Sequence, residues 1–95
     1  MKKEMTKTQK NKEVTKRFLT FVEETFPNYY IDDDGFGGYI TIGYNESNGF
    51  NDDTISFHRS YRDLFCLDSA SDQVKQDADI MQAKLDEIVK ELGLN

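Results

Sequence analysis

The chain has 95 residues, and a hydrophobic fraction of 37% with an aromatic fraction of 13% predicts one ordered domain with a single core. It contains no run of about 18 apolar residues, so we expect no membrane-spanning helix. The lysines near its start are followed by no apolar segment, which argues against a secretory signal. A single cysteine, Cys66, excludes an internal disulfide and favours a cytoplasmic location, because that compartment keeps thiols reduced.

The charge is divided between a basic head and an acidic body. Residues 1–17 hold seven basic and two acidic side chains, a net charge of +5, whereas residues 18–95 carry −11. Such a body favours a charged partner and would repel nucleic acid, so we expect no direct nucleic-acid binding. A simpler interpretation stays open, since acidity also keeps small domains soluble. Residues 1–8 lack an apolar period and are predicted to form a flexible basic arm.

The first regular element is predicted to be an amphipathic helix at residues 9–26. Val14, Phe18 and Val22 recur at intervals of four and lie on one helical face. Pro27 ends the helix, because proline has no amide to donate and disfavours a helical residue before it.

Three strands follow, at residues 29–33, at 39–44, and from residue 50 or 54 to 58. Turns rich in Asp, Asn and Gly separate them. Alternation along the two clearer strands places Ile40, Ile42, Ile55 and Phe57 on one side and Tyr39, Thr41, Ser56 and His58 on the other. The prediction is an antiparallel meander with one apolar face.

Residues 59–70 fit two structures. A short capped helix would dock Leu64, Phe65 and Leu67 on the core, whereas a fourth strand would cover residues 64–67. We favour the helical turn followed by a loop.

The last element is predicted to be a helix at residues 71–92. Val74, Met81 and Leu85 belong to a stripe with spacings of four and three, and Gly93 stands where a helix-ending glycine is expected. A coiled-coil dimer could use the same stripe, but the sheet needs it as a cover.

Together these elements predict an α+β fold, a two-layer sandwich in the order helix, three strands, short connector, helix. Both long helices lie on one face of a three-stranded antiparallel sheet, within a single domain at residues 9–95. The other face of the sheet is left open to solvent or a partner.

The acidic turn at residues 32–38 invites comparison with a calcium loop. With Gly37 at position 6 of an EF-hand, position 5 is Phe36 and position 12 is Gly43, and neither can supply the required oxygen. The glycines also lack the lysine and helix of a phosphate loop. We therefore predict no dedicated metal and no cofactor, and only opportunistic cation binding at this turn.

No catalytic residue is predicted. His58 is the only histidine, and Cys66 lies in the apolar sequence Leu-Phe-Cys-Leu, which favours an inert buried thiol. The aspartates at 32–34 are expected to pair with Arg59 or Arg62, which lie at the same end of the meander. Such an ion pair would tether the connector, and we predict that the chain is not an enzyme.

Acidic and aromatic residues in and between the turns form the candidate partner-binding surface. Its predicted members are Asp32, Asp33, Asp34, Phe36, Tyr39, Glu46, Phe50, Asp52 and Asp53. Rows of carboxylates around aromatics could imitate the phosphates of a nucleic acid and occupy a basic groove on another protein. The alternative is that these are ordinary turn residues, which Asp and Asn often are.

In size and acidity the chain is similar to the small inhibitors that phages and mobile elements make against host nucleases. This likeness is one of type and transfers no residues. It implies a protein partner with a basic, nucleic-acid-binding surface. The alternative is a structural or regulatory module, either a homodimer or an immunity-type subunit, that uses the open sheet face or the last helix.

Overall fold

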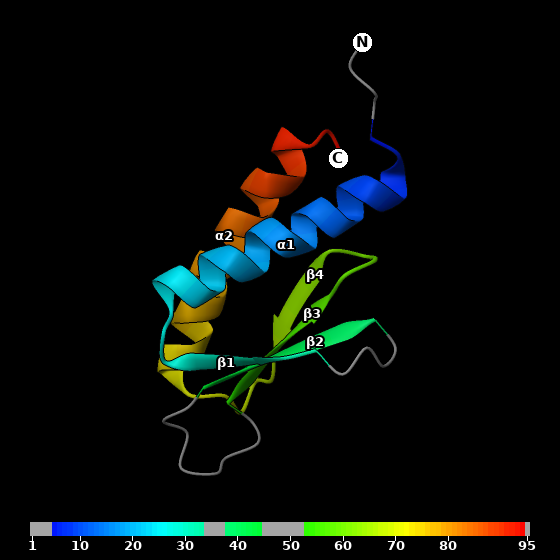
Figure 1. Cartoon of the computed structure of the whole chain (residues 1–95). Helices are drawn as coiled ribbons and strands as arrows, with labels where there is room; N and C mark the ends of the chain where they lie inside the picture. The colour runs from blue at the N-terminus through cyan, green and yellow to red at the C-terminus, as the bar shows by residue number, and fades with distance from the viewer. Residues whose placement is uncertain (1–4, 34–37, 45–52, 95) are drawn as a thin grey trace.

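The computed structural model of the chain describes residues 5–33, 38–44 and 53–94. Its elements are α1 (Lys7–Thr25), β1 (Tyr29–Asp32), β2 (Tyr39–Tyr44), β3 (Thr54–His58), β4 (Asp63–Cys66) and α2 (Asp72–Glu91). The strands form one antiparallel sheet in the order β1-β2-β3-β4, and both helices cover the same face of it (Figure 1). The predicted α+β architecture is confirmed, with one more strand than expected.

Helix α1 begins two residues earlier than predicted because Thr6 and Gln9 cap it. The Thr6 hydroxyl accepts a hydrogen bond from the Gln9 amide at 3.1 Å, and the Gln9 side chain accepts one from the Thr6 amide at 2.8 Å. This reciprocal pair satisfies two backbone donors at the start of the helix. The helix ends at Thr25, two residues before Pro27, as the proline predicts.

The core lies between the sheet and the two helices. Its fully buried members include Val14, Phe18 and Val22 of α1, Ile40, Ile42, Ile55 and Phe57 of the sheet, and Val74, Met81 and Leu85 of α2. The rings of Phe18 and Phe57 lie 4.9 Å apart, where α1 crosses the sheet. The apolar stripe of α2 is thus used by the core. Neither helix in the described ranges is long and apolar enough to cross a membrane.

The favoured helical turn and loop at residues 59–70 is wrong, and the alternative of a fourth strand is confirmed, because residues 63–66 form β4. The backbone of Arg62 has a φ of +57°, and its amide donates a 2.7 Å hydrogen bond to the His58 carbonyl. This closes a four-residue turn, so the chain reverses and pairs Phe57 with Leu64 and Ile55 with Cys66. Hairpin pairing outweighs the local helical pattern.

The new strand also corrects the predicted docking of Phe65 and Leu67 on the core. Leu64 and Cys66 pack against the core, and alternation turns Phe65 to the opposite face. Phe65 is 53% exposed and Leu67 is 44% exposed. The sheet therefore presents more aromatic surface than the sequence pattern indicated.

Candidate functional site on the open face of the sheet

The face of the sheet opposite the helices carries aromatic side chains in contact with solvent. The strand register gives this open face the residues Tyr30, Asp32, Tyr39, Thr41, Gly43, Thr54, Ser56, His58, Asp63 and Phe65. Tyr30 is 46% exposed and Tyr39 is 48% exposed, while Tyr61 in the β3–β4 turn reaches 73%. Exposed rings gathered on one face are typical of a binding surface.

Tyr30 lies across Gly43, its partner on the neighbouring strand. A Cβ atom placed on Gly43 would come within 2.1 Å of the Tyr30 ring. The missing side chain therefore lets the ring cover the backbone of β2, as aromatic residues do beside glycines in other sheets. This contact orients one ring of the open face.

His58 lies between two tyrosines at the other end of the face. Its ring meets Tyr39 edge-on and stacks on Tyr61, with centroid distances of 4.6 Å in both cases. Its Nδ1 accepts hydrogen bonds from the amides of Ser60 at 3.2 Å and Tyr61 at 3.1 Å. A nitrogen that accepts carries no proton, so these contacts need a neutral ring with the proton on Nε2. His58 thus organises the turn and the aromatic cluster.

Two carboxylates stand on the edge strands of the open face. Asp32 belongs to β1 and Asp63 to β4, and both residues are exposed. Within the described part of the chain neither takes part in an ion pair. The exposed rings are therefore flanked by negative charge at both edges of the sheet.

Four of the nine predicted partner-binding residues lie in the described ranges, and only two of them belong to the open face. Asp32 and Tyr39 are the two, on β1 and β2. The predicted residues Asp34, Phe36, Glu46, Phe50 and Asp52 lie outside the described residues.

The other two predicted residues have structural contacts. Asp33 forms an ion pair with Arg59, which confirms the expected link between the first turn and the end of β3. The carboxylate of Asp53 accepts a 2.7 Å hydrogen bond from the amide of Ser71, the N-cap residue of α2. Asp53 therefore holds the start of a helix, as a local turn residue would.

Sequence reasoning missed Tyr30, Tyr61, Asp63 and Phe65 as members of one exposed group. The detectable pattern was the alternation Leu64-Phe65-Cys66, which as a strand sends Phe65 away from the core. The stacking contact between Tyr61 and His58 depends on the tight β3–β4 turn, and no pattern in the sequence predicts it.

The open face offers aromatic rings, hydroxyl groups and carboxylates. Among the described residues, no group of three or more His, Cys, Asp or Glu side chains could hold a metal ion. The tyrosine rings and carboxylates offer apolar area and hydrogen-bond acceptors. No protein-family model, curated protein or solved structure matches the chain.

Proposed function

We propose that this chain is a small acidic protein-binding domain that occupies the basic, nucleic-acid-binding surface of a partner protein. The observation that carries the proposal is the open face itself, which presents the exposed rings of Tyr30, Tyr39 and Phe65 together with the carboxylates of Asp32 and Asp63 on its two edge strands. Aromatic rings supply the anchors of an interface, and the carboxylates supply acceptors for Arg and Lys.

Charge favours a basic protein over other occupants. The residues after Arg17 carry a net charge of −11, and the two arginines of the β3–β4 turn are already engaged, Arg59 by Asp33 and Arg62 by Asn11. A nucleic acid would meet repulsion, whereas a basic groove would be attracted and steered towards the face. Inhibitors of this type are made by phages and mobile elements and act in the cytoplasm, and we propose the same setting here.

The alternative is a homodimer or immunity-type subunit that uses the open face. Two copies placed face to face would bring Asp32 and Asp63 of each copy towards like charges, which disfavours the pair. The apolar stripe of α2 is buried in the core, so it offers a dimer little. We therefore rank a heterologous basic partner above a second copy.

The test is affinity capture followed by competition with DNA. The immobilised domain is incubated with an extract of the cells that carry the gene, and duplex DNA or salt from about 0.05 to 0.5 M elutes the retained proteins. The proposal predicts retention of a DNA- or RNA-binding protein that both treatments release. Tyr39→Ala combined with Phe65→Ala should abolish retention, while Ile80→Ala, on the exposed side of α2, should preserve it.

Three outcomes would contradict the proposal. The double variant could retain the same proteins, the retained protein could ignore DNA and salt, or the isolated domain could itself bind single-stranded nucleic acid through the rings. Sedimentation at high concentration decides the alternative, since a strictly monomeric species removes the homodimer.

A further inference from the structure

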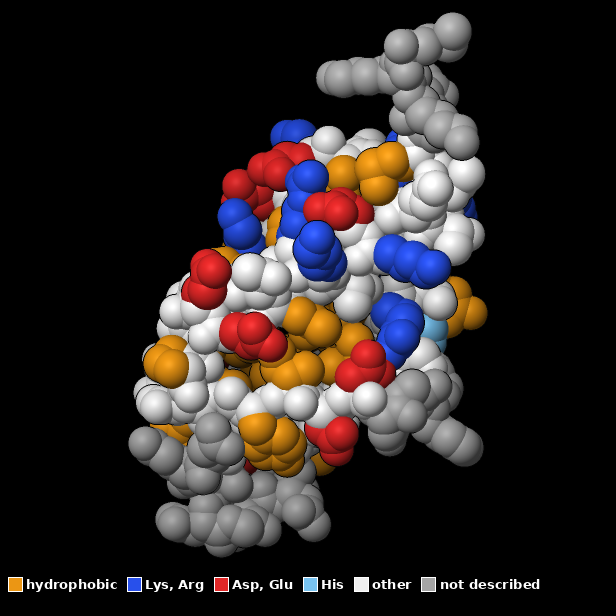
Figure 2. All heavy atoms as spheres, viewed as in Figure 1, with side chains coloured by type: hydrophobic (Ala, Val, Ile, Leu, Met, Phe, Trp, Pro, Cys, Tyr) orange, Lys and Arg blue, Asp and Glu red, His pale blue; other side chains and the backbone are white. Residues whose placement is uncertain are grey.

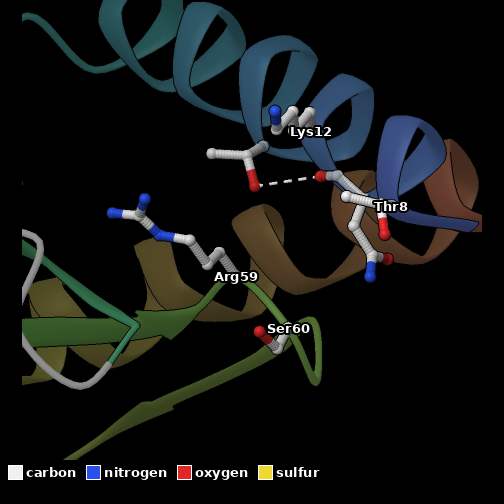
Figure 3. A pocket seen from close by; sticks show the side chains of 6 residues that line it. Thr8, Lys12, Arg59 and Ser60 are labelled. Atoms are coloured by element: carbon white, nitrogen blue, oxygen red, sulfur yellow. Dashed lines mark hydrogen bonds between the residues drawn. The ribbon is translucent and has the colours of Figure 1, made fainter.

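A second site lies on the helix side of the molecule, between the first half of α1 and the β3–β4 turn. A pocket of about 310 Å³ is lined there by Thr8, Asn11, Lys12, Thr15, Arg59 and Ser60. Lys12 and Thr8 approach it from the helix, and Arg59 and Ser60 approach it from the turn (Figure 3). We propose that this pocket binds the phosphate group of a small phosphate ester.

The helical side of the pocket is built from one face of α1. Thr8, Asn11, Lys12 and Thr15 follow the spacing i, i+3, i+4, i+7, so their side chains share one face over two turns. The acidic residue in that stretch, Glu13, lies on another face and pairs with Arg17 at 2.7 Å. All six lining residues are therefore neutral or basic, although the chain as a whole is acidic.

The amide of Asn11 is oriented by a contact from the turn. Its Oδ1 accepts a 2.6 Å hydrogen bond from Nη1 of Arg62, and its backbone carbonyl accepts one from the Thr15 hydroxyl at 3.1 Å. With Oδ1 engaged, the Nδ2 group of Asn11 is the end left to donate. Arg62 adds a positive charge behind this residue without blocking the pocket.

Arg59 supplies a positive charge on the turn side of the pocket. Its Nη2 contacts Asp33, and its Nε, which has no hydrogen-bond partner among the described residues, is shielded from solvent. Arg59 therefore acts on an anion in the pocket through the charge of its guanidinium group. Lys12 provides a second cation, and Ser60 and Thr8 provide hydroxyl donors. Basic side chains are also visible between the first half of α1 and the sheet in Figure 2.

The donor set and the volume indicate the class of ligand. A phosphate dianion offers three acceptor oxygens, which match the ammonium, guanidinium, amide and hydroxyl groups that line the pocket. The pocket is larger than one phosphate ion and lies near the small end of the range for ligand pockets, roughly 300 to 1,000 Å³. It therefore has room for a compact organic group, such as a sugar, beyond the phosphate.

The proposal is tested by NMR titration of the full chain at constant ionic strength, with chloride replaced by inorganic phosphate or by ribose 5-phosphate. We expect saturable amide shifts centred on Asn11, Lys12 and Ser60, with tighter binding of the sugar phosphate. Lys12→Gln should weaken binding about tenfold, and Arg59→Gln should do the same. The matched control Lys75→Gln removes one charge from α2 and should bind like the natural chain.

The substitution Asp33→Asn should change the affinity for phosphate in the opposite direction from Lys12→Gln and Arg59→Gln. Asp33 competes with an incoming anion for Arg59, so its neutralisation should strengthen phosphate binding. Linear shifts spread over all basic residues, equal affinity in Lys12→Gln and Lys75→Gln, or no preference for ribose 5-phosphate would each overturn the proposal. Because Lys12 is exposed, its variant should keep the fold, and thermal unfolding checks this.

Discussion

The hydroxyl of Tyr29 donates a 2.7 Å hydrogen bond to the carboxylate of Asp77, 48 positions further along the chain. Tyr29 begins β1 and Asp77 lies in the second turn of α2, so the bond joins an edge strand to the helix above it. Asp77 is 8% exposed and also accepts hydrogen bonds from Gln73 at 3.1 and 3.2 Å. A buried carboxylate needs such donors, because burial without them is costly.

Tyr29→Phe should destabilise the domain by about 1–3 kcal/mol, because it removes a donor from the buried Asp77. The free energy of unfolding in urea measures this loss. The matched control is Tyr30→Phe, which makes the same chemical change on an exposed ring of the next residue and should cost less than about 0.5 kcal/mol. Equal costs for the two variants would show that the Asp77 contact contributes nothing.

The same pair predicts how stability depends on pH. Burial, together with the hydrogen bond and the charge of Asp77, raises the pKa of Tyr29 well above its ordinary value. The folded state therefore holds this proton more tightly than the unfolded chain, where the hydroxyl titrates near about pH 10. The contribution of Tyr29 to stability is complete below that pH and falls as the pH rises above it.

Urea unfolding between about pH 8 and 11 measures this dependence on either side of the ordinary tyrosine pKa. The natural chain should lose stability more steeply above about pH 10 than Tyr29→Phe does. Parallel profiles for the two proteins would contradict the assignment.

Gly43→Ala should destabilise the domain by roughly 1–2 kcal/mol, because the new methyl group would meet the ring of Tyr30. In the background Tyr30→Ala the same change should be neutral or stabilising, since alanine restricts the unfolded chain more than glycine does. A double-mutant cycle on unfolding free energies measures the coupling. Additive effects would show that the ring does not cover Gly43.

Substitutions of Asp53 and Asp32 should have different effects, since the first should lower the stability of the domain and the second should weaken binding of the partner. Asp53→Ala removes the acceptor of the Ser71 amide and should cost about 1 kcal/mol of stability. Asp32→Ala should leave stability within about 0.5 kcal/mol and weaken capture of the basic partner. Denaturation and the capture assay, applied to both variants, compare the two effects. A stability loss for Asp32→Ala as large as that for Asp53→Ala would count against this division of roles.

The local sequence pattern was sufficient to predict a helix or strand wherever that element buries a regular apolar stripe. The periodicity of Val14, Phe18 and Val22 and the alternation from Tyr39 to Tyr44 predicted α1 and β2, because repeated burial of one face imposes a period on the sequence. The two-layer α+β arrangement followed from the same stripes, since each apolar face needs another to cover it.

Contacts between residues that are distant in the sequence decided the parts of the fold that local patterns did not predict. The β3–β4 turn depends on a left-handed Arg62 and on pairing across the hairpin, so the sequence alone left a helical turn and a fourth strand both open. Asp77 is a charged residue that is buried in α2, and the hydrogen bond from Tyr29 makes this burial tolerable. By itself, the sequence determined the layers and the acidity of this protein. Only the tertiary structure decided which aromatic rings and which carboxylates share the open face, because register and turn geometry choose the side of the sheet on which each residue lies.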